Sequence, residues 1–263
     1  MSSDLLGEIE RGAVGANADL PTLLRKCVAL GGISGSIALR EWATRELKGY
    51  GEGDTLPPYR TIPAILALDG ATMTFRVTGQ QISPASLPDI ARDHIKEEVP
   101  LYGPIAELTD AIKDARERGE SHINFGIPAG SALTALTNHH LRLKGVQYQA
   151  IERIYWKTGV TSLVGVVDTV QTNLVELVAE LRAGIGSGDT VPDKDLTDRA
   201  VNIVIYGDKN RVQVAHAVAD TGGTAEVNAV PEGESKARTI MYWVAGVATV
   251  AGAVIALLVW RPW

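Results

Sequence analysis

Few residues of this chain combine the types and the spacing that catalysis requires. The segment from Gly32 to Ser36, GISGS, approaches the GxSxG turn of serine hydrolases, but it lacks the final glycine and does not follow a predicted strand. Ser34 or Ser36 is therefore expected to cap a helix. The glycines between Gly184 and Gly188 follow a predicted helix, which is the wrong context for a dinucleotide-binding loop.

The titratable side chains do not suggest a catalytic or metal site either. His139 and His140 are neighbours on a predicted helix, where adjacent side chains point about 100° apart and cannot readily chelate one ion together. His94 with Glu97 and Glu98 is expected to form a solvated charged face. We therefore assign no catalytic residue, no metal ligand and no cofactor, and we favour a protein that is not an enzyme.

Composition excludes some classes of protein. The chain has 263 residues, a formal net charge of −6 and an isoelectric point of about 5.4, whereas a general nucleic-acid binder carries a basic face. We expect no nucleic acid among the partners. Cys27 is the only cysteine, so no internal disulfide can form, and it lies in an apolar pattern that predicts a buried, inert thiol.

An uncharged stretch near the C-terminus runs from Ile240 to Trp260. Its 21 residues would form a helix about 31 Å long, which is the thickness of a hydrocarbon core. Aromatic side chains stand at both ends, where lipid headgroups are expected: Tyr242, Trp243, Trp260 and Trp263. The sequence thus predicts that residues 239–260 cross a membrane as one helix, with membrane lipid as their partner.

The part of the chain before this anchor is expected on the cytoplasmic side of the inner membrane. The N-terminus has no basic region followed by an apolar run, and so no secretory signal peptide. Lys236 and Arg238 flank the inner end of the anchor against Arg261 at the other, in the sense of the positive-inside rule.

The predicted anchor is rich in small residues, among them Gly246. Ala248, Gly252 and Ala256 recur every four residues and form a stripe over which helix backbones can approach closely. We therefore expect a homo-oligomer that forms through this stripe.

Hydrophobic patterns predict an α+β domain over residues 1–185, mainly helical with short strands. Three short helices are expected first: one after Ser3 as N-cap, one from Pro21, and one from Ser36 to Lys48 with Trp42 in the core. Two strands should then flank a turn at Asp69-Gly70. Helices over 87–97, 104–118, 131–141 and 160–183 and strands over 121–127 and 147–155 complete the prediction.

The last of these helices has apolar residues spaced alternately by four and three: Leu163, Val167, Val170, Leu174, Leu177 and Leu181. This spacing is typical of a coiled coil or of a tightly packed bundle helix. Packing within the chain and packing between two copies both remain open from the sequence.

Three smaller segments are expected after the domain. They are a linker over 186–198, a small β-hairpin unit over 199–220 and a flexible stalk over 221–238. The hairpin rests on the alternation of Val201, Ile203 and Ile205, followed by a turn and a second alternating run. Two strands alone are marginal in water, so this unit should pair with a second copy or dock on the domain.

Four segments together resemble a known family: LPTLLRKCVALG from Leu20, LREWATRELKGYGEGDTLPPYR from Leu39, INFGIP from Ile123 and YWKTGVTSLVGVVDTVQTNLVELVAEL from Tyr155. They look like the AbiTii domain, a bacterial module of abortive-infection and toxin-type phage defence. The resemblance covers about residues 4–183. Its most specific part is a W-x(4)-L-x-GY motif from Trp42 to Tyr50, followed by LPPYR. It implies a defence context and no particular reaction.

Three functions fit these features. The first is a non-enzymatic defence effector that acts through its anchor when copies cluster at the inner membrane. The second is a membrane-tethered toxin enzyme, for which Trp42, Tyr59 and Arg60 are the candidate site residues. The third is an adaptor that localises a partner defence protein. The missing catalytic constellation favours the first.

Overall fold

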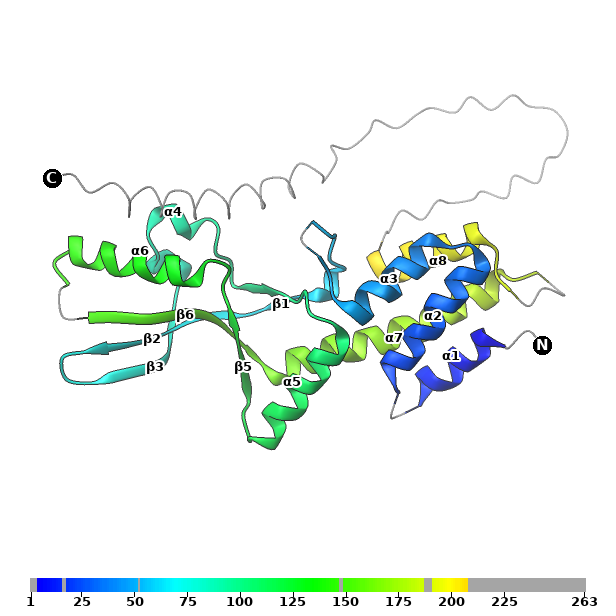
Figure 1. Ribbon diagram of the computed structural model, residues 1–263, viewed down its shortest axis with the longest axis horizontal. Helices are drawn as coiled ribbons and strands as arrows, with labels where there is room; N and C mark the ends of the chain where they lie inside the picture. The colour runs from blue at the N-terminus through cyan, green and yellow to red at the C-terminus, as the bar shows by residue number, and fades with distance from the viewer. Residues whose placement is uncertain (1–3, 16–17, 52, 147–148, 187–190, 208–263) are drawn as a thin grey trace, which may run out of the picture.

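The structure, a computed structural model, describes residues 4–15, 18–51, 53–146, 149–186 and 191–207. The protein is α+β, as the sequence predicts, with most helices gathered at one end and a four-stranded antiparallel sheet at the other (Figure 1). One cluster of buried apolar side chains runs through both parts. The predicted anchor, the predicted stalk and residues 208–220 of the predicted hairpin unit lie outside the described residues.

The helical lobe is built from α1 (Leu5–Val14), α2 (Leu20–Ser34), α3 (Ile37–Lys48), α5 (Ile105–Glu117), α7 (Val160–Gly184) and α8 (Lys194–Tyr206). Four of these helices begin at a short polar side chain that accepts a hydrogen bond from a backbone N–H of the first turn: Asp4, Asp19, Ser36 and Asp193. The predicted cap at Ser36 is confirmed. The first helix is capped by Asp4, one residue after the predicted Ser3.

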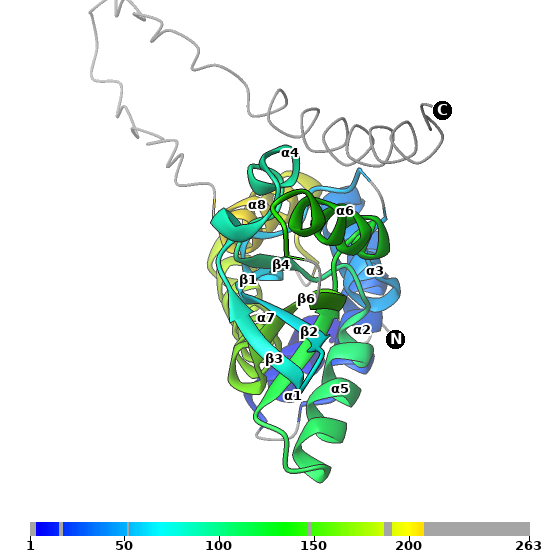
Figure 2. The same cartoon turned by 90° about the vertical axis from the view of Figure 1, so that its left-hand side faces the viewer.

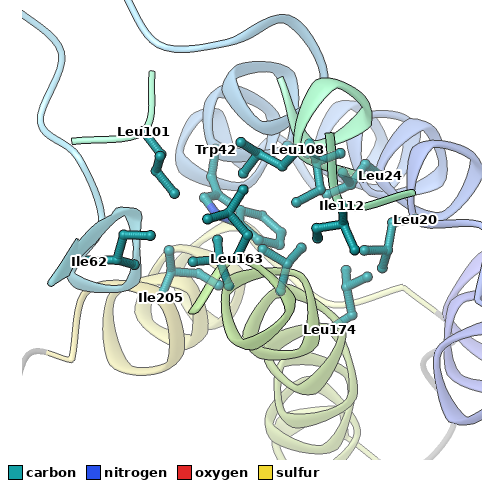
Figure 3. Packing of buried hydrophobic residues seen from close by; sticks show 14 of the residues in the cluster. Leu20, Leu24, Trp42, Ile62, Leu101, Leu108, Ile112, Leu163, Leu174 and Ile205 are labelled. Carbon is teal, nitrogen blue, oxygen red and sulfur yellow. The ribbon is translucent and has the colours of Figure 1, made fainter. Parts of the chain in front are cut away.

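The lobe is organised around α7, which contacts α1, α5 and α8. Its buried side includes Leu163, Val170, Leu174, Leu177 and Leu181, and Figure 3 shows Leu163 and Leu174 among the other apolar side chains of the core. By length and composition, α7 is also the one helix among the described residues that could cross a membrane. Its contacts with three other helices make it a core helix, so the heptad-like pattern is used within the chain.

The sheet has the strand order β3-β2-β6-β5, with every neighbouring pair antiparallel. Its strands are β2 (Ile65–Thr72), β3 (Arg76–Ile82), β5 (His122–Gly126) and β6 (Gln149–Gly159). One face is covered by α6 (Gly130–Leu143), as the end-on view shows (Figure 2). The Asn138 amide fixes this helix, because it donates to the Ile151 carbonyl at 2.7 Å and accepts from the Ile151 N–H at 2.8 Å.

The predicted hairpin turn at Asp69-Gly70 is wrong. Both residues lie inside β2, and the chain turns after Thr72 instead. The pairing of β2 shifts at this point, which marks a β-bulge. A Cβ on Gly70 would lie 2.8 Å from the Ala150 carbonyl oxygen, so the glycine is needed for the close approach of β6. A bulge and a turn favour the same residue types, and the sequence pattern did not separate them.

Short elements connect the two lobes. η1 (Pro58–Arg60) leads into β1 (Thr61–Pro63), which pairs with β4 (Glu98–Pro100), while η2 (Pro84–Ser86) and α4 (Asp89–Arg92) cross between β3 and β4. The predicted helix over 87–97 is therefore reduced to the single turn of α4. The residues that follow α4 lead into β4, which pairs with β1, so the helix does not continue to residue 97.

The predicted strand Val201–Ile205 is wrong, because residues 194–206 form α8. Val201 and Ile205 lie four residues apart and are buried, whereas Ile203 is exposed, which is a helical pattern. α8 packs on α3 and α7, and the Ser36 hydroxyl donates to Asp198 Oδ1 at 2.5 Å. The packed unit therefore continues past the predicted boundary at residue 185 and includes α8.

Candidate functional site

The three candidate side chains Trp42, Tyr59 and Arg60 meet in one cluster, in which Trp42 and Arg60 are buried and Tyr59 is partly buried. α3 supplies Trp42 and η1 supplies Tyr59 and Arg60. Trp42 Nε1 donates to Tyr59 Oη at 2.9 Å. Trp42 is fully buried, which confirms its predicted place in the core, and Figure 3 shows its ring pointing into the apolar cluster.

Glu46 is the centre of this cluster. Its Oε1 accepts hydrogen bonds from Tyr50 Oη at 2.6 Å, from Tyr59 Oη at 2.8 Å and from Arg60 Nε at 3.3 Å. Arg60 Nη2 donates to Oε2 of the same carboxylate, and both charged side chains are 0 % exposed. The Arg60 guanidinium also lies over the Tyr50 ring, 5.3 Å from its centroid. We call these five residues the Glu46 network: Trp42, Glu46, Tyr50, Tyr59 and Arg60.

The network also holds the loop that leads into α5. Arg60 Nη1 donates to the carbonyl oxygens of Gly103 at 2.7 Å and of Leu101 at 3.4 Å. The Leu101 N–H donates to the Arg60 carbonyl at 2.8 Å, and the Tyr50 N–H donates to the Tyr102 carbonyl at 2.8 Å. The guanidinium thus ties together α3, η1 and a loop that follows much later in the chain.

Gly49 permits this arrangement. Its φ of 91° lies in a region that favours glycine, and a Cβ there would come within 2.8 Å of the Tyr102 carbonyl oxygen. Any side chain would push away the loop that Arg60 and Tyr50 hold. The W-x(4)-L-x-GY and YR motifs are therefore explained by one feature, because their glycine and polar side chains all build or admit the Glu46 network.

The electrostatics of the network favour a structural role. Burial raises the pKa of Tyr50 and of Tyr59, and the negative charge of Glu46 raises both further. The two phenols therefore stay protonated and donate to the carboxylate. A carboxylate or guanidinium buried alone costs several kcal/mol, so each needs the other and its hydrogen bonds. A sealed carboxylate with these donors around it has no access to a substrate.

Sequence reasoning missed Glu46 and Tyr50. Glu46 lies four residues after Trp42, the spacing that places side chains on one face of a helix, and four before Tyr50, which follows the end of α3. A carboxylate at that spacing between two aromatic residues, one of them predicted for the core, was the available signal. A buried ion pair is rare enough that a search for typical active-site residues passes over it.

A second polar cluster lies on the sheet. Asp69 of β2 accepts from the Gly79 N–H at 2.7 Å, from Arg153 Nε at 2.5 Å and from Tyr155 Oη at 2.9 Å. Arg153 also lies over the Tyr155 ring, 4.7 Å from its centroid. Burial alone would raise the pKa of Asp69, but these three donors outweigh it and hold the pKa below its usual value. The cluster pins the β-bulge of β2 against β3 and β6.

The other candidates stay apart from both clusters. His94, Glu97, Glu98 and His139 are exposed and His140 is partly buried. In the described part of the chain, no group of three or more His, Cys, Asp or Glu side chains could hold a metal ion. The Cys27 thiol is buried, as predicted, and burial raises its pKa to about 12. Such a thiol is not ionised at neutral pH and is a poor nucleophile.

Comparison with known proteins identifies the family. The AbiTii family model matches residues 4–203, which includes every element from α1 to most of α8. No curated protein matches the chain. No solved structure matches it either. The chain belongs to the AbiTii family, whose context is abortive-infection phage defence.

Proposed function

We propose that this AbiTii-family protein is a membrane-anchored defence effector that acts without catalysis, through association of its copies at the inner membrane. The AbiTii domain lies on the cytoplasmic side in this proposal, and residues 239–260 span the bilayer. Its partners are membrane lipid and further copies of the chain. Another component of the defence system is the partner that triggers the association.

The observation that supports the absence of catalysis most is the sealed Glu46 network. The polar residues of the most specific AbiTii motif, Trp42 and Tyr50 with Tyr59 and Arg60, bond to one buried carboxylate, to each other and to backbone carbonyls. Their hydrogen-bonding groups are used inside the fold. An enzyme that relied on the Glu46 carboxylate or the Arg60 guanidinium would need the fold to open before a substrate could reach them, because both side chains are fully buried.

Self-association is best attributed to the anchor. The apolar pattern of α7 is used within the domain, and the segment expected to form a hairpin with a second copy is helical up to Tyr206. Ala248, Gly252 and Ala256 remain as a stripe that suits close packing of helices in lipid, where no hydrophobic drive acts between them.

Fractionation tests the anchoring. The full chain should sediment with membranes and be released by detergent but not by carbonate or high salt, because ionic strength does not weaken apolar burial. Protease added to intact spheroplasts should leave residues 1–238 uncut. A chain that carbonate releases would refute the anchor, and digestion from outside would refute the orientation.

Growth during controlled expression tests the effector. The full chain should reduce viability and membrane potential, and a chain ending at residue 238 should do neither at equal abundance. Gly252→Ile should weaken crosslinking between copies and reduce the toxicity with it, whereas Val254→Ile, a change to the same residue outside the stripe, should preserve both. Equal toxicity with and without the anchor would contradict the proposal, and an absence of toxicity in every chain would favour the adaptor.

A further inference from the structure

The far end of the sheet exposes apolar side chains that the fold does not use. Met73 is 77 % exposed, Phe75 is 60 % exposed and Leu143 is 73 % exposed. Met73 and Phe75 lie in the β2–β3 turn, and Leu143 ends α6. The register pairs Thr72 with Gln149, so the β2–β3 turn and the connection from α6 to β6 occupy the same end of the sheet. This is the end farthest from the helical lobe in Figure 1, and Figure 2 views it head-on.

The β2–β3 turn holds its apolar side chains outward in a defined way. The Thr72 hydroxyl accepts from the Thr74 N–H at 3.3 Å and from the Phe75 N–H at 3.2 Å, while the Thr72 N–H donates to the Phe75 carbonyl at 2.9 Å. Thr72 therefore satisfies the turn's own backbone groups. The exposed side chains of Met73 and Phe75 can then contact something outside the domain.

Cations lie next to these apolar residues in the sequence, although the whole chain is acidic. Arg142 and Lys144 flank Leu143, and Arg76 follows Phe75; all three cations are exposed. The sequence has no Asp or Glu between residues 70 and 88, and none between residues 130 and 151. The carboxylate of residue 152, a glutamate, is paired with Arg76. We call this end the sheet tip: Met73, Phe75, Arg76, Arg142, Leu143 and Lys144.

We propose that the sheet tip is a second membrane contact, which inserts Met73 and Phe75 between anionic lipid headgroups while Arg142 and Lys144 bind those headgroups. Large apolar side chains flanked by cations suit the boundary between headgroups and acyl chains. A protein partner would need an acidic surface around an apolar pocket. The lipid is favoured because the chain's own uncharged segment Ile240–Trp260 is expected to keep this domain beside a bilayer.

The inference rests on the proposed anchoring, and it sets the orientation that anchoring alone leaves open. Residues 208–238 separate the described domain from the anchor, and this length could reach at most about 110 Å if extended. The anchor alone therefore does not fix which face of the domain meets the bilayer. Insertion of the sheet tip places this end of the sheet against the bilayer, with the helical lobe pointing away from the membrane.

The test uses the full chain, reconstituted through its anchor into vesicles, with a polarity-sensitive dye on Thr74→Cys. Ile33→Cys is the matched control, because Ile33 is 60 % exposed, like Phe75, but lies at the end of α2. The parent chain, whose Cys27 is buried, controls for unwanted labelling. In vesicles of phosphatidylglycerol and phosphatidylcholine, the Thr74→Cys dye should shift to the blue and be quenched by spin-labelled lipid, and the Ile33→Cys dye should do neither.

The insertion should depend on both parts of the tip. Met73→Ser with Phe75→Ser should abolish the quenching, and Arg142→Glu with Lys144→Glu should lower the inserted fraction at least about tenfold, since each cation near an anionic surface is worth about fivefold. Phosphatidylcholine alone should give the same loss. Lys113→Glu is the control for charge reversal, because it makes the same kind of change on α5, away from the tip, and should leave the quenching as it is.

Three results would overturn the proposal. A Thr74→Cys dye that reports water while the chain floats with the vesicles would refute the tip and leave the anchor intact. A blue shift without lipid quenching, rising with protein density, would mean that the tip contacts another copy. Quenching that is equal in both lipids and insensitive to charge reversal would refute the headgroup contact. Conversely, quenching at the tip in a chain that carbonate releases would support the tip and refute the anchor.

Discussion

Breaking the Glu46 network should strongly destabilise the fold. Arg60→Met leaves the Glu46 carboxylate buried without its counter-ion. Glu46→Gln likewise leaves the Arg60 guanidinium buried without its counter-ion. Removing one partner of a buried ion pair costs about 3–5 kcal/mol, which is a large part of a typical folding stability of about 5–15 kcal/mol. Each single variant should therefore lower the free energy of unfolding by about this amount.

The double variant makes this expectation sharper. Glu46→Gln with Arg60→Met strands no charge, and the Gln carbonyl can still accept from Tyr50 and Tyr59. Its cost should be below that of either single variant, and so smaller than the sum of the two single costs by at least about 3 kcal/mol, since contacting residues are not additive.

Urea unfolding of the detergent-solubilised full chain, followed by circular dichroism, measures these differences. Glu120→Gln breaks the solvated Arg118–Glu120 pair and is the control, with an expected effect far smaller than that of either single variant. Single variants that cost under about 1 kcal/mol, or costs that add within about 0.5 kcal/mol, would refute a sealed network.

Three further predictions address the core, α8 and the sheet. Trp42→Ala should cost about 3–5 kcal/mol, and a small effect on the urea midpoint would mean an exposed ring. Trp42→Phe keeps most of the apolar contact but loses the hydrogen bond to Tyr59 and part of the ring volume, so it should cost less, about 1–3 kcal/mol. Ile205→Ala should cost about 2–5 kcal/mol in the same assay and Ile203→Ala less than about 0.5 kcal/mol, and equal effects would contradict the helical packing of α8. Because the pKa of Asp69 is lowered in the folded protein, its ion pair stabilises the fold above about pH 4 and stops doing so as the pH falls through the lowered pKa. Asp69→Asn should flatten this part of the acid dependence of the urea midpoint, and an unchanged dependence would show that Asp69 titrates normally.

Helices with a continuous apolar side were predictable from the sequence. α3 and α5 lie within a residue or two of their predicted ranges, and the start of α7 at Val160 agrees as well. In each case the apolar residues recur at helical spacing and the ends carry cap residues or glycine. The strand β5 was also predicted, and so was β6 as far as Tyr155, because both combine alternation with β-branched or aromatic residues; β6 continues to Gly159.

The errors arose where a local pattern is shared by two structures. Val201, Ile203 and Ile205 alternate like a strand, but apolar residues also stand at positions 200 and 204, and contact with α3 and α7 selects the helix. Asp69-Gly70 suits a turn or a bulge, and only the pairing with β6 decides between them. The Glu46 network could not be predicted whole, because Arg60 binds backbone carbonyls 41 and 43 residues further along the chain, which no local pattern connects to it.

The most direct test of the whole account separates the polar network from the toxicity. Expression of the Glu46→Gln, Arg60→Met double variant, matched in abundance to the natural chain, removes the carboxylate and the guanidinium of the network without stranding a charge. Membrane potential and viability during expression should fall as they do with the natural chain, and they should be restored when the chain ends at residue 238. A double variant that is folded, membrane-bound and harmless, beside a toxic chain that lacks the anchor, would contradict the account and make the Glu46 network a catalytic centre.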